Sequence, residues 1–137
     1  MIQNKAPGKD ISLDDMKEKF PLASKKKDTD FSKFEVCGVE FGDKLIPVMA
    51  GPNMVESEDL IVETAINVKK AGAHFLRGGA FKPRTSPYSF QGLGEDGLKM
   101  LKEASEITSL PLFSEIMDAQ HLSMMEKYVD VLQVGAR

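Results

Sequence analysis

The sequence predicts an α/β fold built on a parallel sheet. From residue 34 onward, short apolar segments alternate with longer segments whose apolar residues recur at helical spacing. After an initial pair of short strands, the resulting order is β-α-β-α-β-α-β, which is typical of a parallel α/β fold. Charged and polar residues also gather where each apolar segment ends, the position at which such folds bind ligands.

The composition is that of an ordinary globular protein. Of the 137 residues, 42% are hydrophobic and 28% are charged. The net charge of -3 provides no basic field for nucleic acid. No apolar run approaches the roughly 20 residues that span a bilayer, and the N-terminus has no apolar signal core. The single cysteine, Cys37, fits a reducing compartment, so we expect a cytoplasmic protein without nucleic-acid or membrane partners.

Residues 1–33 are expected to form an N-terminal arm or linker. The segment Ser12 to Phe20 is a helical candidate, with Ser12 as its N-cap and Asp14 and Asp15 in its first turn. Pro21 should end this helix. The charged stretch SKKKDTD that follows is typical of a linker.

The apolar segments that follow predict a hairpin and four strands. FEVCGVEFG, residues 34–42, alternates around Gly38 and predicts two short strands joined by a turn. LIPVMAG, residues 45–51, predicts a buried strand that ends in glycine. Three further strands are predicted over HFLRGG (74–79), LPLFSEIM (110–117) and VDVLQVGA (129–136).

Three helices are predicted between these strands. The first covers residues 57–71, is capped by Ser57 and ends at Gly72. The second covers residues 95–107, and the third begins at the cap Asp118. The residues expected to face inward are Leu60, Ile61, Thr64, Ala65 and Val68 in the first helix and Leu98, Leu101, Ala104 and Ile107 in the second. The third helix contains Leu122, Met124 and Met125, and the two methionines are expected to fill the core.

Two architectures fit this order of elements. A doubly wound open sheet closes within this length. A (β/α)8 barrel needs roughly 200 residues or more, so the chain would supply only about half of one. The spacing of the elements alone leaves both architectures open.

A cationic cluster is predicted at the carboxyl edge of the sheet. Glu115 ends the third of the four strands, and four cations stand at or beyond strand ends, namely Arg77, Lys82, Arg84 and Arg137. Phosphates and carboxylates are the natural counter-ions for such a cluster. Gly78 and Gly79 would let a ligand approach the backbone closely. The residues therefore predict a site for one or two small phosphorylated anions, with a structural Arg77–Glu115 ion pair and a solvated Lys-Pro-Arg loop as the alternatives.

The remaining chemistry-bearing side chains receive structural interpretations. His74 precedes its strand, at the edge opposite the predicted site, and His121 is expected on a solvated helix face. Cys37 lies in the hairpin, so no chemistry is assigned to it. No metal-ligand cluster is visible in the sequence.

Four stretches of the chain resemble the DAHP synthases in their short microbial form. The longest is LRGGAFKPRTSPYSFQGLGEDGL, residues 76–98, and AGPNMVES, SEIMD and LQVGAR add matches in the same order. The resemblance runs from about residue 34 to the end. It implies a (β/α)8 TIM-barrel fold of which residues 34–137 hold the first four strands, preceded by the short hairpin. It also implies an aldol-type transferase that condenses phosphoenolpyruvate with erythrose 4-phosphate to DAHP and phosphate, the first step of the shikimate pathway of aromatic amino acid biosynthesis.

The resemblance also implies roles for individual residues. Arg77 and Lys82 would hold phosphoenolpyruvate, with Arg137 on its phosphate. Lys82 would also act near the reacting carbons, and Glu115 would help to position the attacking water. The phosphate of erythrose 4-phosphate would be bound by Arg84, Thr85 and Ser86.

The chain departs from the family pattern at Asn53. The family carries a cysteine there that ligates a divalent metal (Mn, Fe, Zn or Co), and a neutral amide is a poor replacement for a thiolate. The metal-independent KDO8P synthases, which use arabinose 5-phosphate, resemble this chain in carrying asparagine. KDO8P synthase is therefore the alternative function, and a non-catalytic phosphate-binding half barrel is a second alternative.

The chain also departs from the family pattern in its length. It stops at the end of the predicted fourth strand, so the family's other metal ligands would lie in a second half. An open four-stranded sheet leaves edge strands and apolar faces exposed. Three explanations stay open: the sequence is a fragment of a longer protein, two copies pair to complete an eight-stranded assembly, or a separate polypeptide supplies the other half of the barrel. Because open half barrels associate, we expect a homo-oligomer or such a partner, and we do not expect the 137-residue chain to be active alone.

Overall fold

The computed structural model describes residues 12–21, 32–42, 44–82, 86 and 88–135. The chain divides into two compact units, residues 1–33 and 34–137. In the first unit, α1 spans Leu13–Lys19. The Ser12 hydroxyl accepts a hydrogen bond from the Asp15 N–H at 3.1 Å, and the Asp15 carboxylate accepts one from the Ser12 N–H at 3.1 Å. This reciprocal pair confirms the predicted cap, while the stretch SKKKDTD lies outside the described residues.

The second unit begins with the predicted hairpin. Strands β1 (Phe34–Val36) and β2 (Val39–Phe41) pair antiparallel. Cys37 and Gly38 connect them with φ values of 50° and 77°, as a two-residue turn with positive φ at both positions requires. The Phe41 ring stacks on Phe34 and packs against the ring of Phe75 with a centroid distance of 5.8 Å. The hairpin therefore packs on the beginning of the next sheet's second strand.

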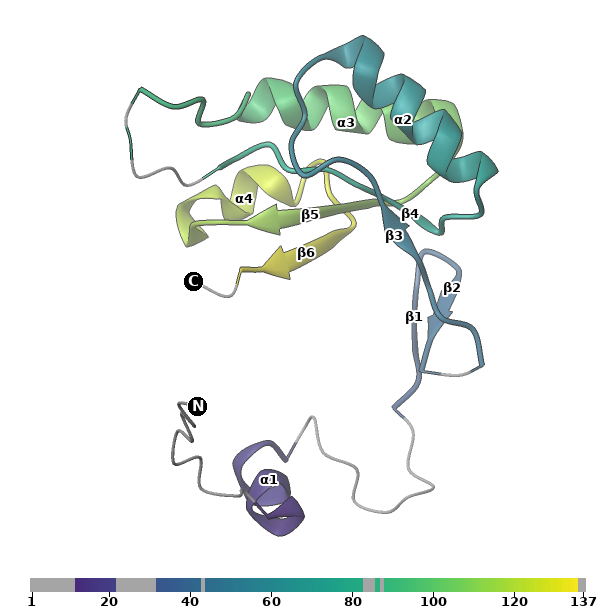
Figure 1. Ribbon diagram of the computed structural model, residues 1–137, viewed down its shortest axis with the longest axis vertical. Coiled ribbons are helices and arrows are strands. Elements are labelled where there is room, and N and C mark those ends of the chain that lie inside the picture. Colours follow the sequence, from purple (N-terminus) through teal and green to yellow (C-terminus); the bar gives the residue numbers. More distant parts are fainter. Residues whose placement is uncertain (1–11, 22–31, 43, 83–85, 87, 136–137) are drawn as a thin grey trace, which may run out of the picture. The chain divides into compact units, whose positions relative to one another are not determined.

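Four parallel strands form the main sheet, in the order β3-β4-β5-β6 (Figure 1). Their bounds are Met49–Ala50 for β3, Phe75–Arg77 for β4, Leu112–Ile116 for β5 and Val131–Val134 for β6. This arrangement confirms the parallel α/β fold class. The described strands follow chain order without the reversal that defines a doubly wound sheet.

The predicted buried strand over residues 45–51 is wrong in its extent and burial. Only Met49 and Ala50 form β3, and Leu45, Ile46 and Val48 are exposed, Ile46 by 80%. In the described part of the chain, β3 pairs with β4 alone, and that pairing begins at Met49. Val48 still bonds to the start of β4, because its carbonyl accepts hydrogen bonds from the His74 and Phe75 N–H groups, but among the described residues no strand pairs with Leu45 and Ile46.

Helices α2 (Glu58–Lys70) and α3 (Glu95–Thr108) pack side by side on one face of the sheet (Figure 1). The Ser57 hydroxyl caps α2 by accepting a hydrogen bond from the Leu60 N–H at 3.4 Å, and Gly72 follows its end with φ +90°. The predicted third helix consists of two short pieces, the 3-10 turn η1 (Ala119–His121) and α4 (Leu122–Met125). Asp118 caps η1 through the Gln120 N–H at 2.9 Å, as predicted.

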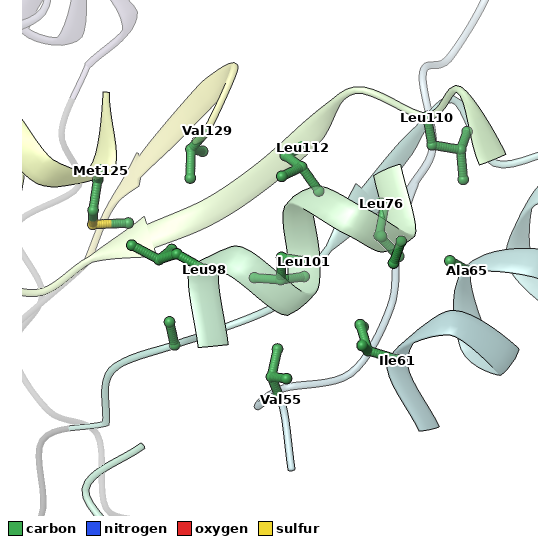
Figure 2. Close-up of a cluster of buried hydrophobic side chains, with 12 residues drawn as sticks. Val55, Ile61, Ala65, Leu76, Leu98, Leu101, Leu110, Leu112, Met125 and Val129 are labelled. Carbon is green, nitrogen blue, oxygen red and sulfur yellow. The ribbon is translucent and has the colours of Figure 1, made fainter. Parts of the chain in front are cut away.

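The core lies between the helices and the sheet, as Figure 2 shows. Leu76 of β4 and Leu112 of β5 meet Leu101 of α3 there, and all three are at most 1% exposed. Gly78 lies beneath the same leucine, because a Cβ at Gly78 would stand 2.5 Å from its Cδ2 atom. The other members drawn in Figure 2 include Val55, Ile61, Ala65, Leu98, Leu110, Met125 and Val129.

Two residues predicted to face inward are exposed, namely Leu60 at 47% and Ile107 at 55%. In α2 the buried stripe runs from Ile61 to Ala65, and Leu60 lies about 100° around the helix from Ile61. In α3 the buried stripe follows Leu98, Leu101 and Ser105. The next residue at that helical spacing is Thr108, so Ile107 lies off the buried stripe. No helix in the described ranges has both the length and the apolar character needed to cross a membrane.

Candidate functional site

The predicted site residues of β4 and β5 lie on the sheet face opposite the core. Successive side chains of a strand point to opposite faces. Leu76 and Ser114 are fully buried on the helix side, which places Arg77 and Glu115 on the other face. The Arg77 Nη2 atom lies 3.7 Å from the Glu115 Oε2 atom, and the two side chains are 20% and 23% exposed. The structural alternative for Arg77, an ion pair with Glu115, is therefore present.

Two glycines bring the loop after β3 against the end of β4. Gly51 has φ +151°, and a Cβ there would stand 1.9 Å from the Arg77 carbonyl oxygen. A Cβ at Gly79 would stand 2.6 Å from the Asn53 carbonyl oxygen, and the Val55 N–H donates to the Gly79 carbonyl at 2.9 Å. Only glycine permits this backbone-to-backbone approach, and it carries Asn53 to the end of β4.

Asn53 joins two cations of the site. Its side-chain oxygen, Oδ1, accepts a hydrogen bond from the Arg77 Nη1 atom at 3.2 Å and a short one from the Lys82 Nζ atom. Arg77 Nη1 also donates to the Pro52 carbonyl at 3.1 Å. Together with Glu115, these residues form one cluster with two formal positive charges and one negative charge. Such a cluster favours an anionic ligand.

The loop after β4 holds Lys82 in place. The Lys82 N–H donates to the Gln91 carbonyl at 2.8 Å, and the Gly94 N–H donates to the Ala80 carbonyl at 3.0 Å. These bonds close the base of the loop. In Figure 1 this loop leaves β4 on the side toward which β5 and β6 point. Lys82 follows the end of β4 by five residues and bonds to Asn53 in the loop after β3, so it stands at the carboxyl edge of the sheet, as predicted.

The structure describes part of the predicted aldose phosphate site. Ser86 is described, and its hydroxyl accepts a hydrogen bond from the Tyr88 N–H at 3.3 Å. The Gln91 Nε2 atom donates to the Ser86 carbonyl at 3.2 Å, so these contacts of Ser86 lie within the loop. Arg84, Thr85 and Arg137 lie outside the described residues.

The interpretation of His121 as a solvated side chain is wrong. Its ring stacks on that of Phe81, with a centroid distance of 4.3 Å and an interplanar angle of 14°. Its Nδ1 atom is buried and has no hydrogen-bond partner within the described ranges. Phe81 precedes Lys82, so the stack fixes the loop beside the site. Nothing local in the sequence indicates a contact between residues 40 positions apart.

The other two side chains with structural interpretations behave as expected. His74 Nδ1 accepts a hydrogen bond from the Val48 N–H at 3.1 Å and so ties β4 to the residue before β3. Cys37 lies near Asp130, which precedes β6 at the edge opposite the site. Cys37 is exposed, and slight desolvation, followed by the Asp130 carboxylate, raises the pKa of its thiol. Both effects disfavour the reactive thiolate.

The described residues do not fit a divalent metal at Asn53. The Asn53 amide oxygen already accepts hydrogen bonds from two cationic groups, and a metal ion at that oxygen would stand beside both positive charges. Among the residues that the structure describes, no group of three or more His, Cys, Asp or Glu side chains is placed to hold a metal. The cluster has the character of an anion site and lacks that of a metal site.

Comparison with known sequences identifies similar proteins over most of the chain. A sequence model of the DAHP synthetase I family matches residues 22–137. The phospho-2-dehydro-3-deoxyheptonate aldolase of Thermotoga maritima is 38% identical over 118 residues, covering 86% of this chain and 35% of that protein. The 2-dehydro-3-deoxyphosphooctonate aldolase of Hydrogenovibrio crunogenus is 32% identical over 110 residues, covering 74% of this chain and 40% of that protein. The chain thus spans about a third to two fifths of the length of these relatives.

Solved structures show the same relationship. The crystal structure of the Thermotoga maritima phospho-2-dehydro-3-deoxyheptonate aldolase (DAHP synthase) matches with a TM-score of 0.74 at 33% identity, covering 99% of this chain and 36% of that chain. A truncated form of 3-deoxy-D-arabino-heptulosonate 7-phosphate synthase from the same organism matches with a TM-score of 0.67 at 34% identity, covering 77% of this chain and 37% of that chain.

Proposed function

The chain belongs to the DAHP synthetase I family, and from this premise we propose that it carries the phosphoenolpyruvate-binding part of a DAHP synthase. The reaction joins phosphoenolpyruvate to erythrose 4-phosphate and releases phosphate. In this proposal the four parallel strands are the first four of a (β/α)8 barrel.

The observation that supports the proposal is the cluster of Arg77, Lys82 and Asn53 at the carboxyl edge of the sheet. Two cations from one strand and its following loop meet at a single amide oxygen. Phosphoenolpyruvate carries a carboxylate and a phosphate, and guanidinium and ammonium groups are the natural partners of both. Holding two anionic substrates together requires such preorganised positive charge.

The proposed roles follow the chemistry of the reaction. The C3 carbon of phosphoenolpyruvate forms a bond to the aldehyde carbon of the sugar, and the aldehyde oxygen takes up a proton. Water adds at C2, and the bond between C2 and the phosphate oxygen breaks, so that phosphate leaves. Lys82 stands near the reacting carbons and neutralises substrate charge. Glu115, oriented by its ion pair with Arg77, accepts a hydrogen bond from the attacking water.

The aldose phosphate would be bound by Arg84, Thr85 and Ser86, and Arg137 would contact the phosphate of phosphoenolpyruvate. These assignments rest on the matching stretches of the sequence. The family's divalent metal (Mn, Fe, Zn or Co) would activate the aldehyde where it is bound. Because the described residues do not fit that ion, no step of the proposal passes through it.

Asn53 is the observation that favours a second candidate function. The 2-dehydro-3-deoxyphosphooctonate aldolases among the relatives correspond to the KDO8P synthases, whose metal-independent members carry asparagine at this position. Such an enzyme would use arabinose 5-phosphate in place of erythrose 4-phosphate. The identity to the heptonate aldolase of Thermotoga maritima is higher, at 38% against 32% for the octonate aldolase, which favours DAHP synthase.

The test is phosphate release by the 137-residue chain supplied with phosphoenolpyruvate and each aldose phosphate in turn, with and without Mn²⁺. Phosphate release with erythrose 4-phosphate but not with arabinose 5-phosphate supports the proposal. Turnover with arabinose 5-phosphate would replace it by the second candidate. Saturable binding of phosphoenolpyruvate without any turnover would favour a non-catalytic phosphate-binding half barrel.

A further inference from the structure

Asn53 is the point at which two separately anchored cations meet. Arg77 ends β4, whereas Lys82 stands five residues further along, in the loop whose base is closed by Gln91. Both side chains donate to the same atom, Asn53 Oδ1. The acceptor comes from a third segment, the loop after β3, which the Gly51 and Gly79 contacts hold in place.

This arrangement reduces two energetic costs of binding an anion between two cations. Two cations that converge on one anion repel each other before the anion arrives. Arginine and lysine side chains also lose considerable rotamer freedom when a ligand fixes them. A shared acceptor offsets both costs, because it draws the cations together in the free protein and reduces the ordering that remains for the ligand to impose.

We propose that Asn53 is a positioning residue that holds Arg77 and Lys82 ready for an anionic substrate. The inference rests on the proposed function for the identity of that substrate, phosphoenolpyruvate. It replaces the interpretation of Asn53 as a weakened metal ligand, because both lone pairs of the amide oxygen already have donors.

The neutrality of the amide is part of the inference. A carboxylate at position 53 would hold the two cations at least as firmly, but it would cancel one of their charges. An apolar side chain would preserve both charges and release the cations. Only a neutral acceptor provides both positioning and net positive charge, since Glu115 already offsets one charge through Arg77.

Three variants of the 137-residue chain separate the effect of positioning from the effect of charge. The measured quantity is the affinity for phosphoenolpyruvate, obtained by calorimetric titration. Asn53→Leu should weaken binding by roughly three- to tenfold through the loss of positioning. Asn53→Asp should weaken it by more, on the order of tenfold or above, through the loss of charge. The matched control is Asn67→Leu, the same change at an exposed position on α2, and it should leave the affinity unchanged.

A second measurement needs no ligand. Nitrogen-15 relaxation of the Arg77 side-chain Nε–H group should show greater mobility in Asn53→Leu than in the wild type, and no gain of mobility in Asn53→Asp. Unchanged mobility together with unchanged affinity in Asn53→Leu would overturn the inference. So would Mn²⁺-dependent binding of phosphoenolpyruvate that is lost in Asn53→Leu and strengthened in Asn53→Asp, because those are the properties of a metal ligand.

The two measurements also separate this inference from the proposed function. A wild-type chain that fails to bind phosphoenolpyruvate contradicts the proposed function. The relaxation measurement then still decides whether Asn53 restrains Arg77.

Discussion

At the scale of single residues, Gly51 shows how backbone space determines the site. Its φ of +151° is rarely adopted by other residues, and a Cβ would stand 1.9 Å from the Arg77 carbonyl oxygen. We predict that Gly51→Ala lowers the free energy of unfolding by about 2–4 kcal/mol, measured by urea denaturation. Gly72→Ala is the matched control, since Gly72 has φ +90° with nothing within 4 Å. It should cost only about 1 kcal/mol, and equal losses at both positions would contradict the close approach.

Cys37 gives a prediction about pH. Slight desolvation and the Asp130 carboxylate both raise the pKa of the thiol in the folded chain, so its reactive thiolate forms at higher pH than in the unfolded chain. Alkylation by iodoacetamide should therefore be slower at pH 8 in the folded chain than in urea. Asp130→Asn should speed the folded-state reaction, because one of the two causes is removed. Equal rates for the folded variant and the folded wild type would show that Asp130 does not act on Cys37.

Contacts between residues close in sequence could be predicted, whereas contacts between distant residues could not. The caps Ser12, Ser57 and Asp118 were predictable because their hydrogen bonds reach only two or three residues along the chain. The bonds of Asn53 to Arg77 and Lys82 span 24 and 29 residues. Sequence patterns place these residues at one edge of the sheet, but they do not reveal which atoms meet there.

At the scale of elements, α3 tests the corrected view of which helix face is buried. Leu101 is 1% exposed within the core, whereas Ile107 is 55% exposed. We predict that Leu101→Ala lowers the free energy of unfolding by about 2–5 kcal/mol, because it leaves a cavity. Ile107→Ala should change it by only about 0.5 kcal/mol. Urea denaturation measures both, and a large loss at Ile107 would restore the prediction that it faces inward.

The positions of the helices and strands along the chain were largely predictable, but the segments that pack against each of them were not. Alternation around Gly38 and helical spacing of apolar residues correctly located the hairpin, α2 and α3. The apolar run at 45–48 was predicted to be buried, but burial depends on a neighbouring strand that a local pattern does not contain. The stack of Phe81 on His121 was missed for the same reason.

At the scale of the whole molecule, the parallel topology explains why the site residues gather. The carboxyl ends of β3, β4 and β5 lie at one edge, so that loops and strand ends distant in sequence come together there. The sequence order of strands and helices therefore predicted that Arg77, Lys82 and Glu115 share this edge, whereas the structure shows that Asn53 joins them. Arg84, Thr85 and Arg137 stay predictions, because they lie outside the described residues.

The edge strands of the sheet and two exposed apolar residues give a prediction about association. Within the described ranges, β3 and β6 each pair on one side only, and Ile46 and Val134 are 80% and 82% exposed. Exposed edges of this kind favour pairing with another chain. We predict that sedimentation velocity shows concentration-dependent self-association, and that Val134→Lys weakens it more than Ile107→Lys does. A monomer at all concentrations would contradict the expected oligomer.

The central claim is that the cluster formed by Arg77, Lys82 and Asn53 binds phosphoenolpyruvate. Calorimetric titration of the 137-residue chain at a known oligomeric state tests it most directly, with Lys82→Ala as the test variant and Lys69→Ala, on the last turn of α2, as the control. The account predicts saturable binding by the wild type and by Lys69→Ala, and loss of binding in Lys82→Ala. Equal affinity of all three chains, or no binding by the wild type, would contradict it.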